Sequence, residues 1–172
     1  QELRPGLFEN FEQLEQMPEP QAPLKYRDRE PGFRPSRQED PLNAILRRCS
    51  LKGASSGKLA GKRFGLKNNI CVSGMPMTCG SLLLEDYVAD TDATIVTRLL
   101  DAGAEVTALL NLENFSFSGG GETSAFGPIL NPHNPEHLAS GSSGGSAAAL
   151  YYDDIDITIG ADQGGSIRAP AS

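Results

Sequence analysis

Apolar side chains recur every three or four residues near the start of the chain, and Pro18 follows the last of them. This spacing puts them on one face of a helix, and a proline ends the run because it lacks the backbone N–H of the next turn. The face consists of Leu7, Phe8, Phe11, Leu14 and Met17. Residues 19–41 carry five prolines and predict an extended arm. We expect residues 1–58 to form a helix and a Pro-rich arm that pack on the core, the alternative being a disordered tail.

From Leu59 onward, short apolar runs alternate with an amphipathic helix pattern. Residues 63–67 predict a strand that ends in an Asn-Asn turn, and residues 105–110 predict a second, buried strand. Between them, the apolar residues at 95, 96, 99 and 100 share one helical face, and Gly103 is placed to end the helix in the left-handed conformation. Strand, helix and strand in this order predict a βαβ unit.

A second unit of this kind follows, with a helix predicted at 147–152 and a strand at 155–160. Repeated βαβ units are typical of α/β proteins, so we predict a parallel or mixed β-sheet covered by helices. The pattern stops at Ser172, which leaves the last strand with an exposed edge, and such edges are avoided in natural proteins. We therefore expect residues 59–172 to be the N-terminal part of a larger domain, whose remainder belongs to a continuing or companion chain.

The composition argues against several classes of protein. The 172 residues include 15 basic and 22 acidic side chains without a basic block. A nucleic-acid partner is not expected, because binding one requires basic side chains that neutralise its phosphates. No stretch approaches the ~18 apolar residues of a membrane span. Cys49, Cys71 and Cys79 lack the C-x-x-C spacing of zinc or redox sites. We predict reduced thiols in a cytoplasmic protein, with no metal and no cofactor.

Two segments rich in glycine and serine, 140–146 and 162–170, carry the candidate chemistry. Glycines let backbone N–H groups approach an anion, and the first segment precedes a helix, whose N-terminal end is positive. The absence of Gly-Lys-Ser/Thr after the glycines argues against a phosphate-binding P-loop. Backbone donors aimed at an oxyanion beside an activated serine are instead typical of acyl transfer.

The residues leave two interpretations of the base that such a serine needs. Both histidines, His133 and His137, lie in a polar loop, and neither Ser142 nor Ser166 has the G-x-S-x-G of a nucleophile elbow. Both observations disfavour a Ser-His-Asp triad. Lys67, at the end of an apolar strand, is the alternative base, whereas the simpler interpretation is an ordinary lysine at an exposed strand end.

Four segments occur in the same order and at similar spacing in a known family: residues 65–69, 74–81, 141–149 and 162–170. Through them, from about Lys62 to its end, the chain resembles the amidase signature family of serine hydrolases. The sequence Asp-Gln-Gly-Gly-Ser-Ile-Arg is most similar to the corresponding segment of the broad-substrate amidases associated with nitrile metabolism. The resemblance implies the amidase signature fold, an α/β fold with a mixed β-sheet core covered by helices on both sides. Residues 59–172 would be the N-terminal part of its catalytic domain.

The resemblance also implies roles for individual residues. Ser166 would be the nucleophile, Ser142 the bridging serine after a cis peptide bond, and Lys67 the base. The implied oxyanion hole consists of the backbone amides of Gln163, Gly164, Gly165 and Ser166. The implied supporting residues are Gly141, Ser143, Asp162 and Arg168, the last two as organisers of the loop. The chain departs from the common family pattern at Asn68, Ser140 and Ala161, none of which is in the triad.

A lysine base must be neutral near pH 7, so burial has to lower the pKa of Lys67 from about 10.4 toward ~7–8. Three pKa units correspond to roughly 4 kcal/mol. We therefore expect a dry pocket in which no carboxylate pairs with the amine.

The expected activity is hydrolysis of a small carboxylic amide to the acid and ammonia or an amine, through an acyl-enzyme. The alternatives are the glutaminase subunit of a tRNA-dependent amidotransferase, a family member that cleaves urethanes or esters, and an inactive structural subunit. The glycine-rich residues 118–123 and Phe126 are candidates for the wall of the acyl pocket, the alternative being a simple mobile loop. A homodimer is one option for the assembly, which the sequence leaves open, and an isolated 18.3 kDa chain is expected to be inactive.

Overall fold

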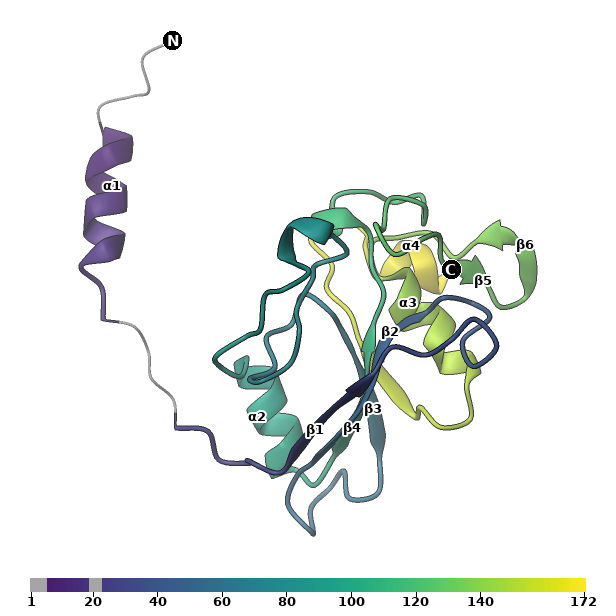
Figure 1. Cartoon of the computed structure of the whole chain (residues 1–172), viewed down its shortest axis with the longest axis horizontal. Helices are drawn as coiled ribbons and strands as arrows, with labels where there is room; N and C mark the ends of the chain where they lie inside the picture. Colours follow the sequence, from purple (N-terminus) through teal and green to yellow (C-terminus); the bar gives the residue numbers. More distant parts are fainter. Residues whose placement is uncertain (1–5, 19–22) are drawn as a thin grey trace.

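A computed structural model describes residues 6–18 and 23–172, and its centre is a five-stranded mixed sheet (Figure 1). The strands stand in the order β1-β2-β4-β3-β7. Their bounds are β1 (Arg29–Phe33), β2 (Ile45–Lys52), β3 (Arg63–Lys67), β4 (Glu105–Leu110) and β7 (Ile157–Ile159). Strand β3 runs parallel to both β4 and β7, whereas β2 pairs antiparallel with β4 and with β1. The predicted α/β class is confirmed.

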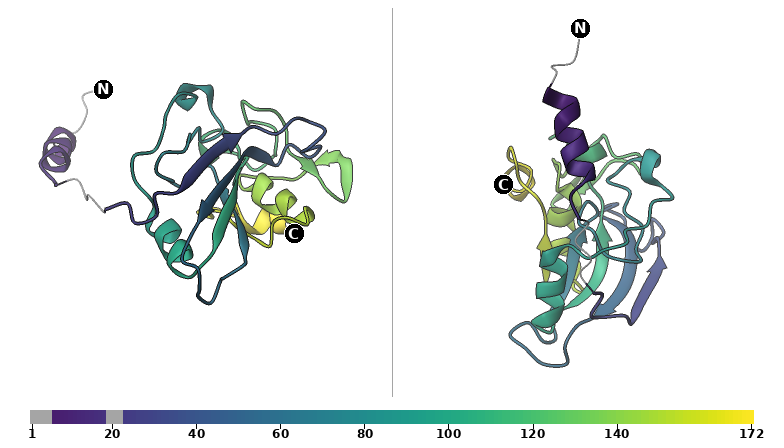
Figure 2. Two further views of the ribbon diagram at one scale, coloured as in Figure 1. Left: turned by 60° about the horizontal axis from the view of Figure 1, so that its bottom comes forward. Right: turned by 90° about the vertical axis from the view of Figure 1, so that its left-hand side faces the viewer.

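Helices cover both faces of this sheet (Figures 1 and 2). On one face lies α2 (Thr94–Asp101), and on the other α3 (Gly144–Ala148), which continues into the 3-10 turn η3 (Ala149–Tyr151). The smaller elements are η1 (Leu82–Leu84), η2 (Asn114–Ser116), β5 (Leu130–Asn131), β6 (Asn134–Leu138) and α4 (Arg168–Ala171). Gly103 ends α2 with a φ of 89°, as the sequence predicts. Measured by length and hydropathy, no helix within the described residues qualifies as a membrane span.

Two apolar clusters fill the space between sheet and helices because side chains alternate between the faces of a strand. Phe64 and Leu66 of β3 pack with Leu100 of α2 in the first cluster. Ala108 and Leu110 of β4 pack in the second cluster, which includes the helical residues Ala148 and Ala149. By alternation along β3, Lys67 points to the second face, on which α3 lies.

The sheet begins earlier in the chain than the expected division between an arm of residues 1–58 and a domain that starts at residue 59. Strand β2 lies between β1 and β4, and Leu42, Ala44 and Ile45 are buried in the second cluster. The division missed this strand because Arg47 and Arg48 interrupt its apolar pattern, although both are half-buried in the sheet.

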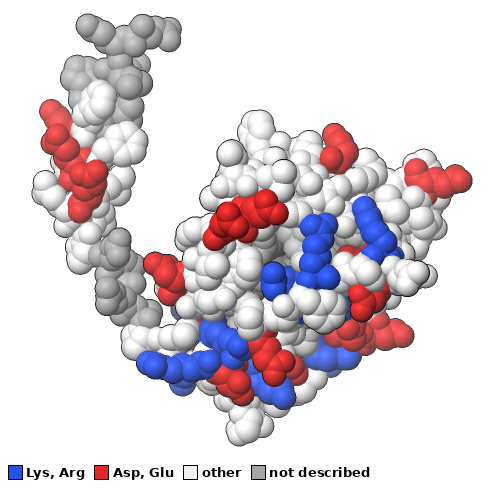
Figure 3. All heavy atoms as spheres, in the orientation of Figure 1, with Lys and Arg blue, Asp and Glu red and all other residues white. Residues whose placement is uncertain are grey.

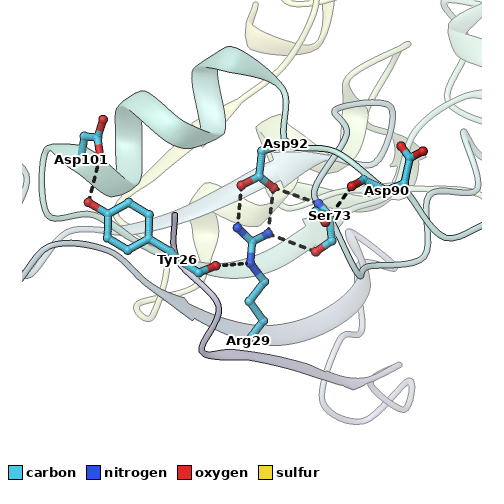
Figure 4. Close-up of polar contacts among 6 residues, drawn as sticks. All are labelled: Tyr26, Arg29, Ser73, Asp90, Asp92 and Asp101. Atoms are coloured by element: carbon cyan, nitrogen blue, oxygen red, sulfur yellow. Dashed lines mark hydrogen bonds and ion pairs between the residues drawn. The ribbon is translucent and has the colours of Figure 1, made fainter. Parts of the chain in front are cut away.

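The segment before β2 is anchored to the core by polar contacts (Figure 4). The Arg29 guanidinium donates two hydrogen bonds to the Asp92 carboxylate, at 2.8 and 2.5 Å, and both side chains are less than a tenth exposed. The same guanidinium donates to the carbonyl oxygens of Tyr26 and Ser73, and the Tyr26 hydroxyl donates to Asp101 of α2. Removing one partner of a buried ion pair is strongly destabilising, so this cluster fixes the arm against α2.

The predicted N-terminal helix forms as α1 (Gly6–Glu15) and ends before Pro18. Its expected packing on the core is not observed. The side chains of Phe8, Phe11, Leu14 and Met17 are 56–63% exposed, and the helix lies away from the sheet (Figures 1 and 2). Leu7, whose side chain was expected on the same face, lies outside the described side chains. Acidic groups are the only charged side chains of α1, whereas basic and acidic groups are interspersed over the viewed face of the core (Figure 3).

Candidate active site

Lys67 ends β3, a strand with neighbours on both sides. A strand buried between two parallel neighbours requires an apolar run, which residues 64–66 supply. At its end, the Lys67 side chain has no exposed surface, and its Nζ donates a hydrogen bond of 2.7 Å to Ser142 Oγ. The structure thus joins two predicted site residues that are 75 positions apart, and the interpretation of Lys67 as an exposed strand-end lysine is wrong.

Burial controls the charge of this amine. Removal from water lowers the pKa of Lys67 from its ordinary 10.5 to about 8, because desolvation penalises the ammonium form. The negative charges of Asp162 and Glu113 oppose the shift, and no carboxylate forms an ion pair with Lys67 among the described residues. A pKa near 8 leaves part of the amine neutral at pH 7 and therefore able to accept a proton.

Ser142 lies in the tight segment that leads into α3. It is fully buried, and the Gly141–Ser142 peptide bond is cis, which matches the resemblance. Its carbonyl oxygen accepts a hydrogen bond of 3.2 Å from the backbone N–H of Glu113. A Cβ at position 141 would lie 2.5 Å from Cγ of Glu113, so only glycine fits there.

Ser143 connects the two glycine-serine segments. Its backbone N–H donates to the carbonyl oxygen of Ser166 at 3.0 Å, and its hydroxyl donates to the carbonyl oxygen of Ala161 at 3.1 Å. The helix that follows, α3, packs directly against the end of β4. This close approach is seen at Gly145, where a Cβ would lie 2.2 Å from the carbonyl oxygen of Asn111. The end of β7 and the start of α3 are therefore held together at the site.

Asp162 organises the segment that contains Ser166. Its carboxylate accepts hydrogen bonds from the backbone N–H groups of Gly165, Ile167 and Arg168, and a bidentate pair from the Arg168 guanidinium. The guanidinium, helped by the three amides, holds the pKa of this carboxyl far below its usual range. The network has one consequence for the expected oxyanion hole: the Gly165 N–H already donates to Asp162 at 2.7 Å, so it is not available to an oxyanion in this conformation.

Ser166 borders a pocket of about 530 Å³. The pocket is also lined by residues 163–165 and by residues 116–119, which run from the end of η2 into the following loop. Ser166 is half-buried, and within the described residues no hydrogen bond joins its Oγ to that of Ser142. Catalytic hydrogen bonds are often long before a substrate binds, so the geometry is compatible with a relay that closes on binding.

The two candidates for the pocket wall separate in space. Ser118 and Gly119 of the glycine-rich loop line the Ser166 pocket. Phe126 instead lines a separate pocket of about 190 Å³, together with Arg34 and Arg47.

Sequence reasoning missed a buried charged residue that contacts the site. Glu113 has no exposed surface and contacts both the Ser142 segment and the loop of the pocket. Its position three residues beyond β4 was a usable signal, because polar residues after the carboxyl ends of parallel strands gather at one edge of a sheet.

The described residues contain no group of three or more His, Cys, Asp or Glu side chains that could hold a metal ion. His133 and His137 are exposed in the β5–β6 hairpin, and neither lines the Ser166 pocket. Cys49, Cys71 and Cys79 are free thiols. Burial raises the pKa of Cys49 to about 12, which keeps this thiol protonated and unreactive.

The sequence matches the family model Amidase over residues 40–172. This chain belongs to the amidase family. It is 48% identical over 123 residues to a glutamyl-tRNA(Gln) amidotransferase subunit of Haloarcula marismortui, a match that covers 72% of this chain and 29% of that protein. The same subunit of Halobacterium salinarum is 44% identical over 131 residues, or 76% of this chain and 31% of the relative. The chain thus spans about three tenths of the length of these relatives.

Solved structures of amidase-family proteins have the same fold. The corresponding glutamyl-tRNA(Gln) amidotransferase subunit of Thermotoga maritima superimposes with a TM-score of 0.71 at 38% identity, over 77% of this chain and 30% of that one. Native peptide amidase from Stenotrophomonas maltophilia gives a TM-score of 0.66 at 31% identity, over 76% and 30%. The family match begins at residue 40, before the sheet strand β2, rather than near Lys62. The finer resemblance to nitrile-associated amidases stays a prediction.

Proposed function

We propose that this chain supplies the nucleophile, the relay serine and the base of an enzyme that hydrolyses carboxylic amides. The observation that carries the proposal is the buried 2.7 Å hydrogen bond from Lys67 to Ser142, next to the pocket that Ser166 borders. An amine kept partly neutral by burial, bonded to a hydroxyl beside a second serine, can draw a proton from the attacking oxygen through that hydroxyl.

The reaction would proceed in two steps. Ser142 takes the proton of Ser166 and passes its own to Lys67, while Ser166 Oγ bonds to the carbonyl carbon of the amide. The resulting oxyanion would be held by backbone N–H groups of residues 163–166, with Gly165 joining only if its bond to Asp162 opens. The C–N bond then breaks, and the proton on Lys67 returns through Ser142 to the leaving amine. Water hydrolyses the ester by the same proton route and frees the acid.

A second candidate function is the glutaminase subunit of a tRNA-dependent amidotransferase. The observation that favours it is the 44–48% identity to proteins named as a subunit of glutamyl-tRNA(Gln) amidotransferase. The chemistry at Ser166 would be the same, but glutamine would be the substrate and the ammonia would pass to a partner protein. Ammonia release from glutamine that depends on a co-purifying partner would favour this candidate, and turnover of simple amides without it would favour the first.

The partners follow from the same proposal. The substrate is a small amide, and the rest of the catalytic domain comes from a continuing or companion polypeptide, because the chain spans 29–31% of its relatives. Neither a cofactor nor a metal takes part in the proposed steps. A cytoplasmic location remains a prediction from the three free thiols.

The test is covalent labelling with a fluorophosphonate, which phosphonylates activated serines. The protein is purified with whatever polypeptide accompanies it, and intact mass identifies the components. We expect one label on Ser166 in the wild type, none in Ser166→Ala, and unchanged labelling in Ser56→Ala, an exposed serine away from the pocket. An unlabelled wild type, or a Ser166→Ala variant that still reacts at the site, contradicts the proposal.

A further inference from the structure

Glu113 holds the loop that forms one wall of the Ser166 pocket. Its carboxylate accepts hydrogen bonds from the backbone N–H of Gly121, from the backbone N–H of Thr123 at 2.8 Å and from the Thr123 hydroxyl. Residues 116–119, from the end of η2 into the same loop, line the pocket. Both oxygens of this fully buried carboxylate accept hydrogen bonds. It tethers the loop strongly, because a donor that lost its bond to the carboxylate would be left buried without a partner.

Glu113 also holds the relay serine, through the backbone of that serine. Its backbone N–H donates to the carbonyl oxygen of Ser142, and its side chain packs so closely on Gly141 that no Cβ fits between them. Lys67 binds the hydroxyl of Ser142, so this serine is fixed at both its side chain and its backbone. The pocket wall and the relay therefore share one anchor.

We infer that Glu113 is a positioning residue of this site, which sets the relay serine against the pocket wall and places a buried negative charge near the base. The inference rests on the proposed function. The charge matters at one step: when Lys67 takes up the proton, the ammonium forms away from water and gains a buried counter-charge. Accordingly, Glu113 is among the groups that raise the pKa of Lys67 against the effect of burial.

Two substitutions separate the charge of Glu113 from its geometry. Glu113→Gln keeps the size of the side chain and removes the charge, while Glu113→Asp keeps the charge and withdraws it by one methylene. Glu136→Gln is the matched control, the same exchange at an exposed carboxylate of β6 that does not line the Ser166 pocket. The readouts are the pKa of Lys67, from an NMR titration of its side-chain amine, and the fluorophosphonate labelling rate of Ser166 at pH 9.

We expect Glu113→Gln to lower the pKa of Lys67, and Glu113→Asp and Glu136→Gln to leave it at the wild-type value. The labelling rate should fall roughly tenfold or more in both Glu113 variants, because small displacements of reacting groups have large effects on rate, and should stay unchanged in Glu136→Gln. A purely structural role would lower the unfolding temperature without moving the pKa of Lys67. An unchanged pKa in Glu113→Gln, or wild-type labelling in both Glu113 variants, overturns the inference.

A milder substitution covers the case in which the Glu113 variants do not fold. Thr123→Val removes one donor to the carboxylate and keeps the charge, so we expect a several-fold lower labelling rate with an unchanged pKa of Lys67; wild-type labelling would then overturn the inference. The NMR titration needs no catalysis. Failure of the wild type to label therefore contradicts the proposed function, whereas a labelled wild type with unaffected variants contradicts the role of Glu113 alone.

Discussion

The two halves of the candidate site differ in what holds them. The base half, Lys67 and Ser142, has no exposed surface and depends on β3, on the segment before α3 and on Glu113. The nucleophile half depends on Asp162, whose partners lie three to six residues along the chain, and its Arg168 side chain is 78% exposed. The geometry of the base is thus tied to the fold of the whole sheet, whereas that of the nucleophile depends on its own loop and on one backbone hydrogen bond from Ser143 to Ser166.

The largest expected effect comes from removing the base. Lys67→Met keeps an unbranched side chain, one heavy atom shorter, and takes away the amine that accepts the proton. Because general base catalysis contributes about 10²–10⁴-fold, we expect the fluorophosphonate labelling rate of Ser166 to fall roughly 10³-fold. A labelling rate within a few-fold of the wild-type rate would show that the base half does not activate the nucleophile.

The folding stability of this variant serves as its control. A pKa shift from 10.5 to about 8 corresponds to about 3 kcal/mol by which burying the amine destabilises the fold at pH 7. Between pH 8 and 10.5 the unfolded chain binds the proton and the folded chain does not, so this penalty disappears as the pH rises. Lys67→Met should therefore unfold no more easily than wild type at pH 7 in urea, and any advantage should narrow toward pH 10.5. A pH-independent difference would contradict burial as the cause.

The pH dependence of the wild type tests the same half without a substitution. Because burial lowers the pKa of Lys67 to about 8 and only the neutral amine accepts a proton, the labelling rate should rise about tenfold per pH unit below 8 and level off above it. Rates measured from pH 6 to 9.5 provide the check. A profile that is flat between pH 6 and 8 would mean that another group is the base.

A smaller effect is expected from a substitution in the nucleophile half. Asp162→Asn keeps the size of the side chain but removes the charge that holds Arg168 and one acceptor for the loop amides. We expect labelling to fall roughly tenfold, as for a small displacement of the reacting group, with little change in the unfolding temperature because the contacts are local. The acid limb of the pH profile should also move to lower pH, since the charge of Asp162 raises the pKa of Lys67.

The matched control for this variant is Asp154→Asn, which breaks an exposed ion pair with Arg48 away from the pocket. Exposed pairs contribute little to stability, so it should label like the wild type. Equal labelling rates in Asp162→Asn and Asp154→Asn would show that the Asp162 network affects Ser166 no more than an ordinary surface ion pair does.

Local patterns in the sequence determined the strand at 63–67, the strand at 105–110 and the helix between them, because periodicity and turn chemistry act among near neighbours. They also identified both glycine-serine segments and a lysine at a strand end. The sequence did not indicate that β2 belongs to the sheet, since charged residues interrupt its apolar pattern while its neighbours in the sheet cover them.

Only the tertiary structure decided which of these groups meet. Lys67 and Ser142 are 75 residues apart, and the sheet order brings them within hydrogen-bond distance. The same arrangement buries Glu113 between the Ser142 segment and the loop of the pocket. Contacts of this kind depend on how distant segments pack, and burial itself then changes the chemistry by lowering the pKa of the lysine.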